Sequence, residues 1–143
     1  MAEHPRIIGF KDSSANVIKL ASVLAVRPDW QVFAGTGSVL LPFLSLGAAG
    51  GIMALANFAA IPLRRIWDCF HAGQWEQARE TQLALTEINT CVTSRYGVPG
   101  LKYALDACGY YGGPPRRPLL PLGPTAREEI DALLARLDLK SQG

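Results

Sequence analysis

The sequence predicts an α/β fold with parallel strands, and three observations support this. Three short apolar segments read as buried strands, at residues 6–10, 30–35 and 50–57. Each is followed by a segment with helical features, at residues 13–28, 38–46 and 62–71. Regular alternation of strand and helix implies parallel strands joined by right-handed crossovers.

Each βα unit carries its own start and stop signals. Ser13 or Ser14 is placed to cap the first helix, whose apolar residues recur at i, i+3, i+4 and i+7, and Pro28 closes it. Gly47 is the stop signal of the second helix. The third strand is nearly all apolar, so we expect it to be covered on both faces.

Only helices are expected after the third unit. The pattern predicts helices over residues 75–96 and 99–108, then a linker over residues 109–124. Thr125 with Glu128 forms a capping box for a last helix with an apolar stripe. The chain therefore divides into βα units over residues 1–72 and a helical extension over residues 73–143.

Composition excludes several classes of function. The 143 residues are 49% hydrophobic with a net charge of +2, and no basic stripe suggests a nucleic-acid partner. The uncharged run from Trp30 to Leu63 is broken by proline and glycine, so we read it as a buried part of a protein outside the membrane. The three cysteines match no metal motif and are expected to be reduced and buried. The first nine residues resemble neither a signal nor a transit peptide. The cysteine pattern leads us to expect a cytoplasmic protein, with mitochondria left open.

Lys11 stands where the first strand ends, and the carboxyl ends of parallel strands are where such folds bind ligands. It could be an ordinary solvated residue paired with Asp12. Alternatively, it is a nucleophile, because a dry apolar environment favours the neutral amine, which attacks ketones. Ser13 and the Gly35-Thr36-Gly37 segment lie at neighbouring strand ends, although each could serve only as a cap or a turn.

Four segments in this order resemble the later half of the dihydrodipicolinate synthase / N-acetylneuraminate lyase family. They are IIGFKDSSAN, VFAGTG, GAAGGIMALAN and RYGVPGLKYALDACGYYGGPPRRPL. The KDSS and GYYGGPPRRPL stretches look most like the 4-hydroxy-2-oxoglutarate aldolase branch, whereas the synthases more often carry Glu after the lysine. Dihydrodipicolinate synthase and 2-keto-3-deoxy sugar acid aldolase remain alternatives within the family.

The resemblance implies a partial (β/α)8 TIM barrel, comprising strands six to eight with their helices, followed by a C-terminal helical extension. It also implies Schiff-base chemistry on a 2-oxo acid, with pyruvate as product or substrate and without a metal or diffusible cofactor. By motif, Lys11 matches the Schiff-base lysine. Ser13, Gly35 and Ile52 match positions that contact substrate.

Strands one to five of such a barrel, with the residues that relay protons and hold the substrate carboxylate, have no counterpart here. We expect a truncated form with poor solubility and little or no turnover, and a homo-oligomer if the full barrel is present. A non-catalytic half-barrel that assembles with another chain is the alternative. A small nucleotide-binding α/β domain is a weaker one, because the glycine fingerprint of such domains is absent.

Overall fold

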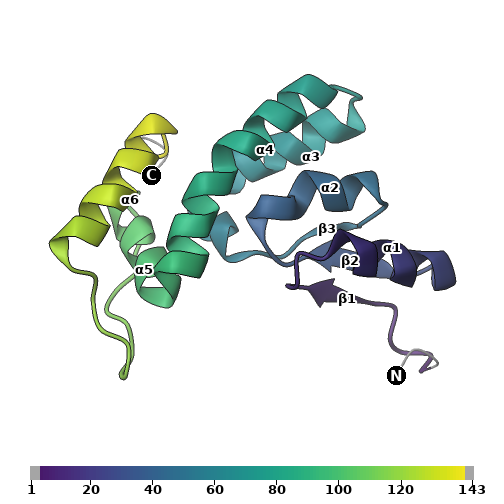
Figure 1. Ribbon diagram of the computed structural model, residues 1–143, viewed down its shortest axis with the longest axis horizontal. Helices are drawn as coiled ribbons and strands as arrows, with labels where there is room; N and C mark the ends of the chain where they lie inside the picture. Colours follow the sequence, from purple (N-terminus) through teal and green to yellow (C-terminus); the bar gives the residue numbers. More distant parts are fainter. Residues whose placement is uncertain (1–3, 141–143) are drawn as a thin grey trace.

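The computed structural model describes residues 4–140, so Met1 lies outside the described part. The chain alternates three strands with helices and then continues as helices (Figure 1). The first part comprises β1 (Gly9–Asp12), α1 (Val17–Val26), β2 (Gln31–Ala34), the 3-10 turn η1 (Gly37–Val39), α2 (Leu40–Ser45), β3 (Gly50–Gly51) and the 3-10 turn η2 (Ala54–Asn57). The second part comprises α3 (Ala60–His71), α4 (Trp75–Asn89), the π-helix η3 (Thr90–Arg95), α5 (Gly97–Ala107) and α6 (Pro124–Arg136).

The strands form one parallel sheet in the order β1-β2-β3, as the alternation predicted. Lys11 is in register with Phe33, and Phe33 in turn with Gly50. Within the described residues β1 and β3 are the sheet edges. The α/β class with parallel strands is confirmed, and a three-stranded parallel sheet is consistent with part of a barrel.

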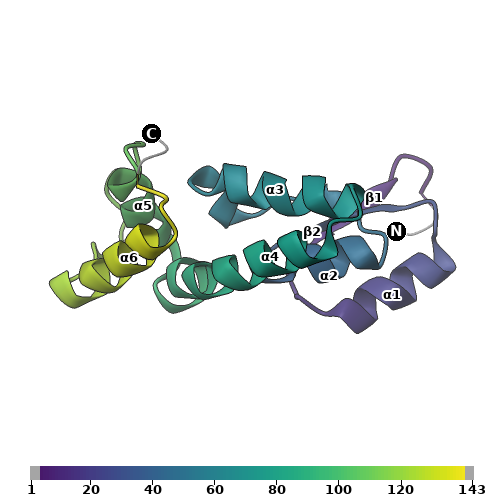
Figure 2. The same ribbon diagram turned by 90° about the horizontal axis from the view of Figure 1, so that it is seen from above.

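Helices α1 and α2 cover one face of the sheet. Val32 and Ala34 of β2 are fully buried on that face. It is also the face of Asp12, which reaches Lys19 on α1, because Asp12 and Ala34 are in register. Phe43 of α2 is likewise fully buried. Figure 2 shows the sheet and α1 at one end of the molecule and α5 and α6 at the other.

The first βα unit differs from the prediction in two details. The strand occupies Gly9–Asp12 rather than residues 6–10, because pairing with β2 continues as far as Asp12 and Ala34. Neither Ser13 nor Ser14 caps α1. The N-cap is Asn16, whose Oδ1 accepts a 3.0 Å hydrogen bond from the Lys19 N–H, while the Ser14 hydroxyl donates to Asp12. The helix still ends just before Pro28, as predicted.

The second unit follows the prediction, and Gly47 ends its helix with a φ of 95°. The third strand was predicted too long. Only Gly50 and Gly51 are in register with β2, whose last residue is Ala34, and the following residues turn into η2. Full coverage of this segment was also wrong for the described residues, because the Ile52 side chain is 56% exposed.

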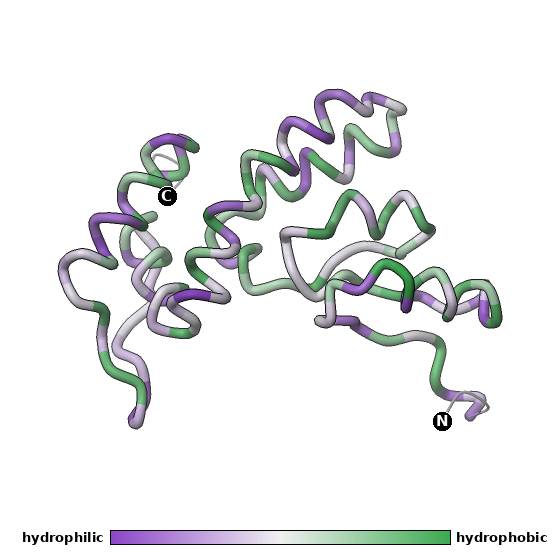
Figure 3. Tube along the Cα trace, viewed as in Figure 1, coloured by the Kyte–Doolittle hydropathy of each residue, from purple (hydrophilic) through white to green (hydrophobic). Residues whose placement is uncertain are grey.

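The helical part begins with the hairpin of α3 and α4, and hydrophilic and hydrophobic residues alternate along both helices (Figure 3). The helix predicted over residues 75–96 is α4 followed by the π-turn η3. The predicted capping box is wrong. Helix α6 starts at Pro124 with Gly123 as its N-cap and no side-chain cap, because proline suits the first helical position.

A single hydrophobic core runs from the sheet through the helices, from Leu20 of α1 to Leu139. Cys69, Cys91 and Cys108 are free and buried within it, as expected. No helix within residues 4–140 is both long and apolar enough to cross a membrane.

Candidate functional site

Strand alternation sets the direction of Lys11. Successive side chains on a strand point to opposite faces, and Asp12 points towards α1. Lys11 therefore lies on the opposite face of the sheet, at the carboxyl end of β1, and its side chain is exposed. The lysine belongs to the strand itself rather than to the loop that follows it.

Asp12 is the buried carboxylate on the helix side of β1, and the sequence analysis gave it no role beyond a possible partner of Lys11. It is only 4% exposed, and its Oδ1 accepts a 2.7 Å hydrogen bond from Lys19 Nζ. Its Oδ2 accepts a 2.7 Å hydrogen bond from the Ser14 hydroxyl. Burial tends to raise the pKa of Asp12, but the hydrogen bonds from Lys19 and Ser14 outweigh it and hold the pKa below its usual value. Asp12 pairs with Lys19, and Lys11 points to the opposite face of the sheet, so the alternative in which Lys11 pairs with Asp12 is not what the structure shows.

Lys11, Ser13 and Gly35 lie close together. A Cβ atom placed on Gly35 would lie 2.4 Å from Ser13 Oγ and 2.8 Å from Lys11 Cε. The Gly35 N–H donates a 2.7 Å hydrogen bond to the Asp12 carbonyl oxygen, which extends the ladder one residue beyond the end of β2. Both side chains therefore occupy space that only a glycine leaves open.

Ile52 lies one strand further along. It follows β3 directly, and its N–H donates a 2.8 Å hydrogen bond to the Ala34 carbonyl oxygen. Alternation from Gly50, which is in register with Phe33, places Ile52 on the same face of the sheet as Lys11. The four predicted residues thus share one face at the carboxyl ends of three strands.

The loop that carries Gly35 also contacts two side chains that sequence reasoning missed. Gln82 and Asn89 of α4 are buried and form hydrogen bonds to residues 36–41. A signal was present in the sequence. Core residues recur at 78 and 85 of α4 and at 92 of η3, and the two amides stand at 82 and 89 in the same periodic stripe.

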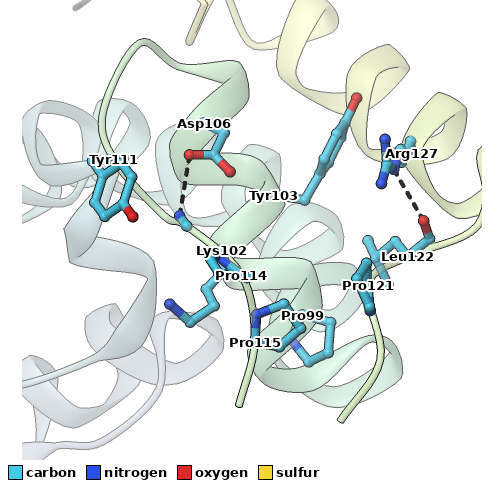
Figure 4. A pocket seen from close by; sticks show the side chains of 11 residues that line it. Pro99, Lys102, Tyr103, Asp106, Tyr111, Pro114, Pro115, Pro121, Leu122 and Arg127 are labelled. Carbon is cyan, nitrogen blue, oxygen red and sulfur yellow. Dashed lines mark hydrogen bonds between the residues drawn. The ribbon is translucent and has the colours of Figure 1, made fainter. Parts of the chain in front are cut away.

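A cavity of about 350 Å³ lies elsewhere, between α5, α6 and the segment that connects them (Figure 4). Its polar groups already have partners: Lys102 donates to the Gly112 carbonyl, Asp106 accepts from the Gly112 N–H, and Arg127 donates to the Leu122 carbonyl. These contacts hold the connecting segment against the helices. The cavity contains none of the four predicted site residues.

No group of three or more His, Cys, Asp or Glu side chains suited to a metal ion occurs among residues 4–140. The fold and the site together define a parallel α/β protein with a lysine, a serine and a glycine gathered at the carboxyl ends of its strands. Its relatives narrow this class to a family.

A model of the dihydrodipicolinate synthetase family matches residues 1–137. The chain belongs to this family. It is 33% identical over 139 residues to an uncharacterized DapA-like lyase of Halobacterium salinarum, covering 97% of this chain and 46% of that protein. It is 30% identical over 131 residues to a 4-hydroxy-tetrahydrodipicolinate synthase of Exiguobacterium, covering 91% of this chain and 45% of the relative.

Solved structures of the same family also resemble this chain. A putative dihydrodipicolinate synthase of Thermus thermophilus is 35% identical with a TM-score of 0.88, over 96% of this chain and 48% of that one. A prophage protein of the family from E. coli, solved in complex with pyruvate, is 26% identical with a TM-score of 0.82, over 93% of this chain and 47% of that one. The chain therefore spans about half the length of the relatives it matches.

Proposed function

We propose that this chain carries the imine-forming half of a class I aldolase that acts on a 2-oxo acid, with Lys11 as the nucleophile. The observation that carries the proposal is the meeting of Lys11, Ser13 and Gly35 at the carboxyl ends of two parallel strands. Membership of the dihydrodipicolinate synthetase family and the pyruvate complex of a relative support it.

The reaction follows from the chemistry of an amine beside a ketone. Lys11 Nζ adds to the C2 carbonyl carbon, and loss of water leaves a protonated imine. A base that the remaining βα units must supply then takes the proton of the C4 hydroxyl, the C3–C4 bond breaks, and its electron pair moves into the iminium group to give an enamine and an aldehyde. Protonation at C3 and hydrolysis release pyruvate and return the free amine; synthesis is the reverse. The Ser13 hydroxyl is placed to orient the substrate, and Gly35 leaves room for its distal end. Ile52 would contact the pyruvyl portion.

The KDSS form at the end of β1 favours 4-hydroxy-2-oxoglutarate as the substrate, which would yield glyoxylate with pyruvate. The 4-hydroxy-tetrahydrodipicolinate synthases among the relatives make that synthesis the second candidate. The two are separated by supplying each substrate to the assembled protein and measuring which one is turned over.

The chemistry requires a dry amine, and Lys11 is exposed in this chain. Large apolar side chains around β1 and α1 are exposed as well: Ile8 by 67%, Ile18 by 76% and Val26 by 78%. We propose that five further βα units, on the same or another polypeptide, cover these side chains and close a barrel around Lys11. We further propose that residues 1–72 are the barrel portion, that residues 73–143 are its helical extension, and that the closed barrels associate into homo-oligomers.

Reductive trapping tests the proposal. The chain is incubated with pyruvate and borohydride, alone and together with the N-terminal half of the Thermus thermophilus relative, and modified lysines are mapped by mass spectrometry. Lys11 should be the dominant adduct only in the mixture, and Lys11→Arg should remove it. A mixture in which Lys11 is modified no more than the surface Lys140 would refute the assignment. Assembly of the two halves without any adduct would instead favour a non-catalytic assembly module.

A further inference from the structure

Helix α4 carries two buried side-chain amides that face the segment after β2. Gln82 is 5% exposed and Asn89 is 2% exposed. They stand seven residues apart, which is close to two helical turns, so both lie on one face of the helix. Buried amides require hydrogen-bond partners, and these partners identify the segment that packs against this face of α4.

Both amides bind the segment that follows β2. Gln82 Nε2 donates to the Gly37 carbonyl oxygen at 2.8 Å, and Gln82 Oε1 accepts from the Leu41 N–H at 2.8 Å. Asn89 Oδ1 accepts from the Gly37 N–H at 3.2 Å. Asn89 Nδ2 donates to the hydroxyls of Thr36, at 2.9 Å, and Ser38, at 2.7 Å.

These bonds replace caps that the segment lacks. Neither η1 nor α2 has an N-terminal side-chain cap of its own. The first N–H groups of a helix have no partner within the helix and need one from elsewhere. The amides of α4 provide such partners for Gly37 and Leu41, so the path of the backbone after β2 depends on a helix far along the chain.

That backbone begins beside the candidate nucleophile. Gly35, one residue before Thr36, is where Lys11 and Ser13 meet. We propose that Gln82 and Asn89 are positioning residues, which hold the segment of residues 35–41 so that Gly35 stays against Lys11. The helical extension would then be part of the active-site framework. This role rests on the proposed function of Lys11.

The hydrogen-bond chemistry makes the two positions respond differently to the same change. The Gly37 carbonyl can only accept, so Gln82→Glu places a carboxylate oxygen against it and removes the donor. Every partner of Asn89 can donate, namely one N–H and two hydroxyls, so Asn89→Asp can retain all three bonds. Gln77 is exposed on the same helix, so Gln77→Glu is a matched control.

Backbone hydrogen exchange over residues 35–41 tests whether Gln82 and Asn89 hold this segment; we call this hold the clamp. We expect Gln82→Glu to accelerate exchange there by about tenfold, Asn89→Asp by less than about threefold, and Gln77→Glu not at all. Pyruvate-dependent trapping at Lys11 is measured in parallel in the assembled protein, which is the chain in complex with the N-terminal half of the Thermus thermophilus relative. Gln82→Glu should raise the pyruvate concentration that gives half-maximal adduct, at temperatures where all variants are fully folded.

The outcomes separate the two proposals. Unchanged exchange over residues 35–41 in Gln82→Glu overturns the clamp. Faster exchange with an unaltered pyruvate dependence overturns the positioning role. Equal effects of Gln82→Glu and Asn89→Asp contradict the donor argument. If the wild-type assembly forms no adduct at Lys11, the proposed function fails and the positioning role fails with it, while exchange alone decides whether the amides hold the turn.

Discussion

Gly35→Ala is the substitution that most directly probes the contact of β1 with the segment after β2. The added Cβ would lie 2.4 Å from Ser13 Oγ, 2.6 Å from the Asp12 carbonyl oxygen and 2.8 Å from Lys11 Cε. The two side-chain atoms can rotate away, because Ser13 and Lys11 are exposed. The Asp12 oxygen cannot, because it belongs to the backbone and accepts the 2.7 Å hydrogen bond from Gly35 itself.

The size of the effect follows from that oxygen. Ordinary contact begins near 3.4 Å, so the two backbones must separate by about 0.8 Å, which stretches the hydrogen bond that joins them. Overpacking of this kind costs about 1–3 kcal/mol. The same displacement moves Lys11 and Ser13 away from Gly35, so trapping at Lys11 in the assembled protein should also fall.

Urea denaturation followed by circular dichroism measures the loss of stability. Gly123→Ala is the control, because nothing lies within 4 Å of its Cβ position and its φ is −71°. Gly123 is an N-cap, so this variant should lose less than about 1 kcal/mol. A Gly35→Ala variant as stable as the wild type, with undiminished trapping, would refute the packing of Lys11 and Ser13 against Gly35.

Three further outcomes follow from the structure. Asp12→Asn should destabilise the chain by about 1–2 kcal/mol at neutral pH, because it removes the bond to Lys19. The pKa of Asp12 is lower in the folded than in the unfolded chain, so this loss of stability should be fully present above about pH 4 and shrink as the pH falls through the folded pKa. Urea titrations that give the same difference at every pH would contradict the bond to Lys19. Burial is the larger cause, and the nearby charge of Glu129 the smaller one, that raises the pKa of the Cys91 thiol to about 11. Cys91 should therefore resist disulfide reagents at pH 8 until the protein is unfolded. Rapid labelling of Cys91 in the folded chain, located by peptide mapping, would argue against its burial. Phe43→Ala should lower the free energy of unfolding by about 3–5 kcal/mol, because Phe43 is fully buried. Tyr111→Ala, at a residue that is 87% exposed, should change it by less than about 0.5 kcal/mol. Similar losses for the two variants in thermal melts would place Phe43 outside the core.

The parallel sheet and the meeting of Lys11, Ser13 and Gly35 were predictable because they follow from local pattern. The alternation of strand and helix fixes parallel pairing, and parallel pairing brings successive strand ends to one edge. Lys11 could be placed at that edge from its position alone. The sequence placed Lys11 just after the strand, whereas it lies within β1. The end of β1 depends on how far its pairing with β2 continues, and no residue near Lys11 reveals that.

Two local signals misled the sequence analysis. The apolar run after Gly50 looks like a strand, but only two of its residues find a partner on β2. Thr125 and Glu128 have the spacing of a capping box, yet Pro124 allows the helix to begin earlier. In both cases a neighbouring residue or strand decides the boundary, and the motif does not.

The amides of α4 could be located but not interpreted from the sequence. Gln82 and Asn89 interrupt an apolar stripe, which marks them as buried polar groups. Their partners lie more than 40 residues earlier in the chain. Only the packing of α4 against η1 and α2 identifies those partners and connects the helical part to the site.

The proposed chemistry requires Lys11 to pass from an exposed sheet face into a closed barrel. Competitive labelling of amines with a reagent too bulky to enter a closed barrel measures this directly, on the chain alone and on its complex with the N-terminal half of the Thermus thermophilus relative, after the complex is purified by size exclusion. We predict that Lys11 reacts as readily as Lys140 in the chain alone, and at least about tenfold more slowly in the complex, while Lys140 is unchanged. Equal reactivity of Lys11 in the chain and in the purified complex would contradict the account.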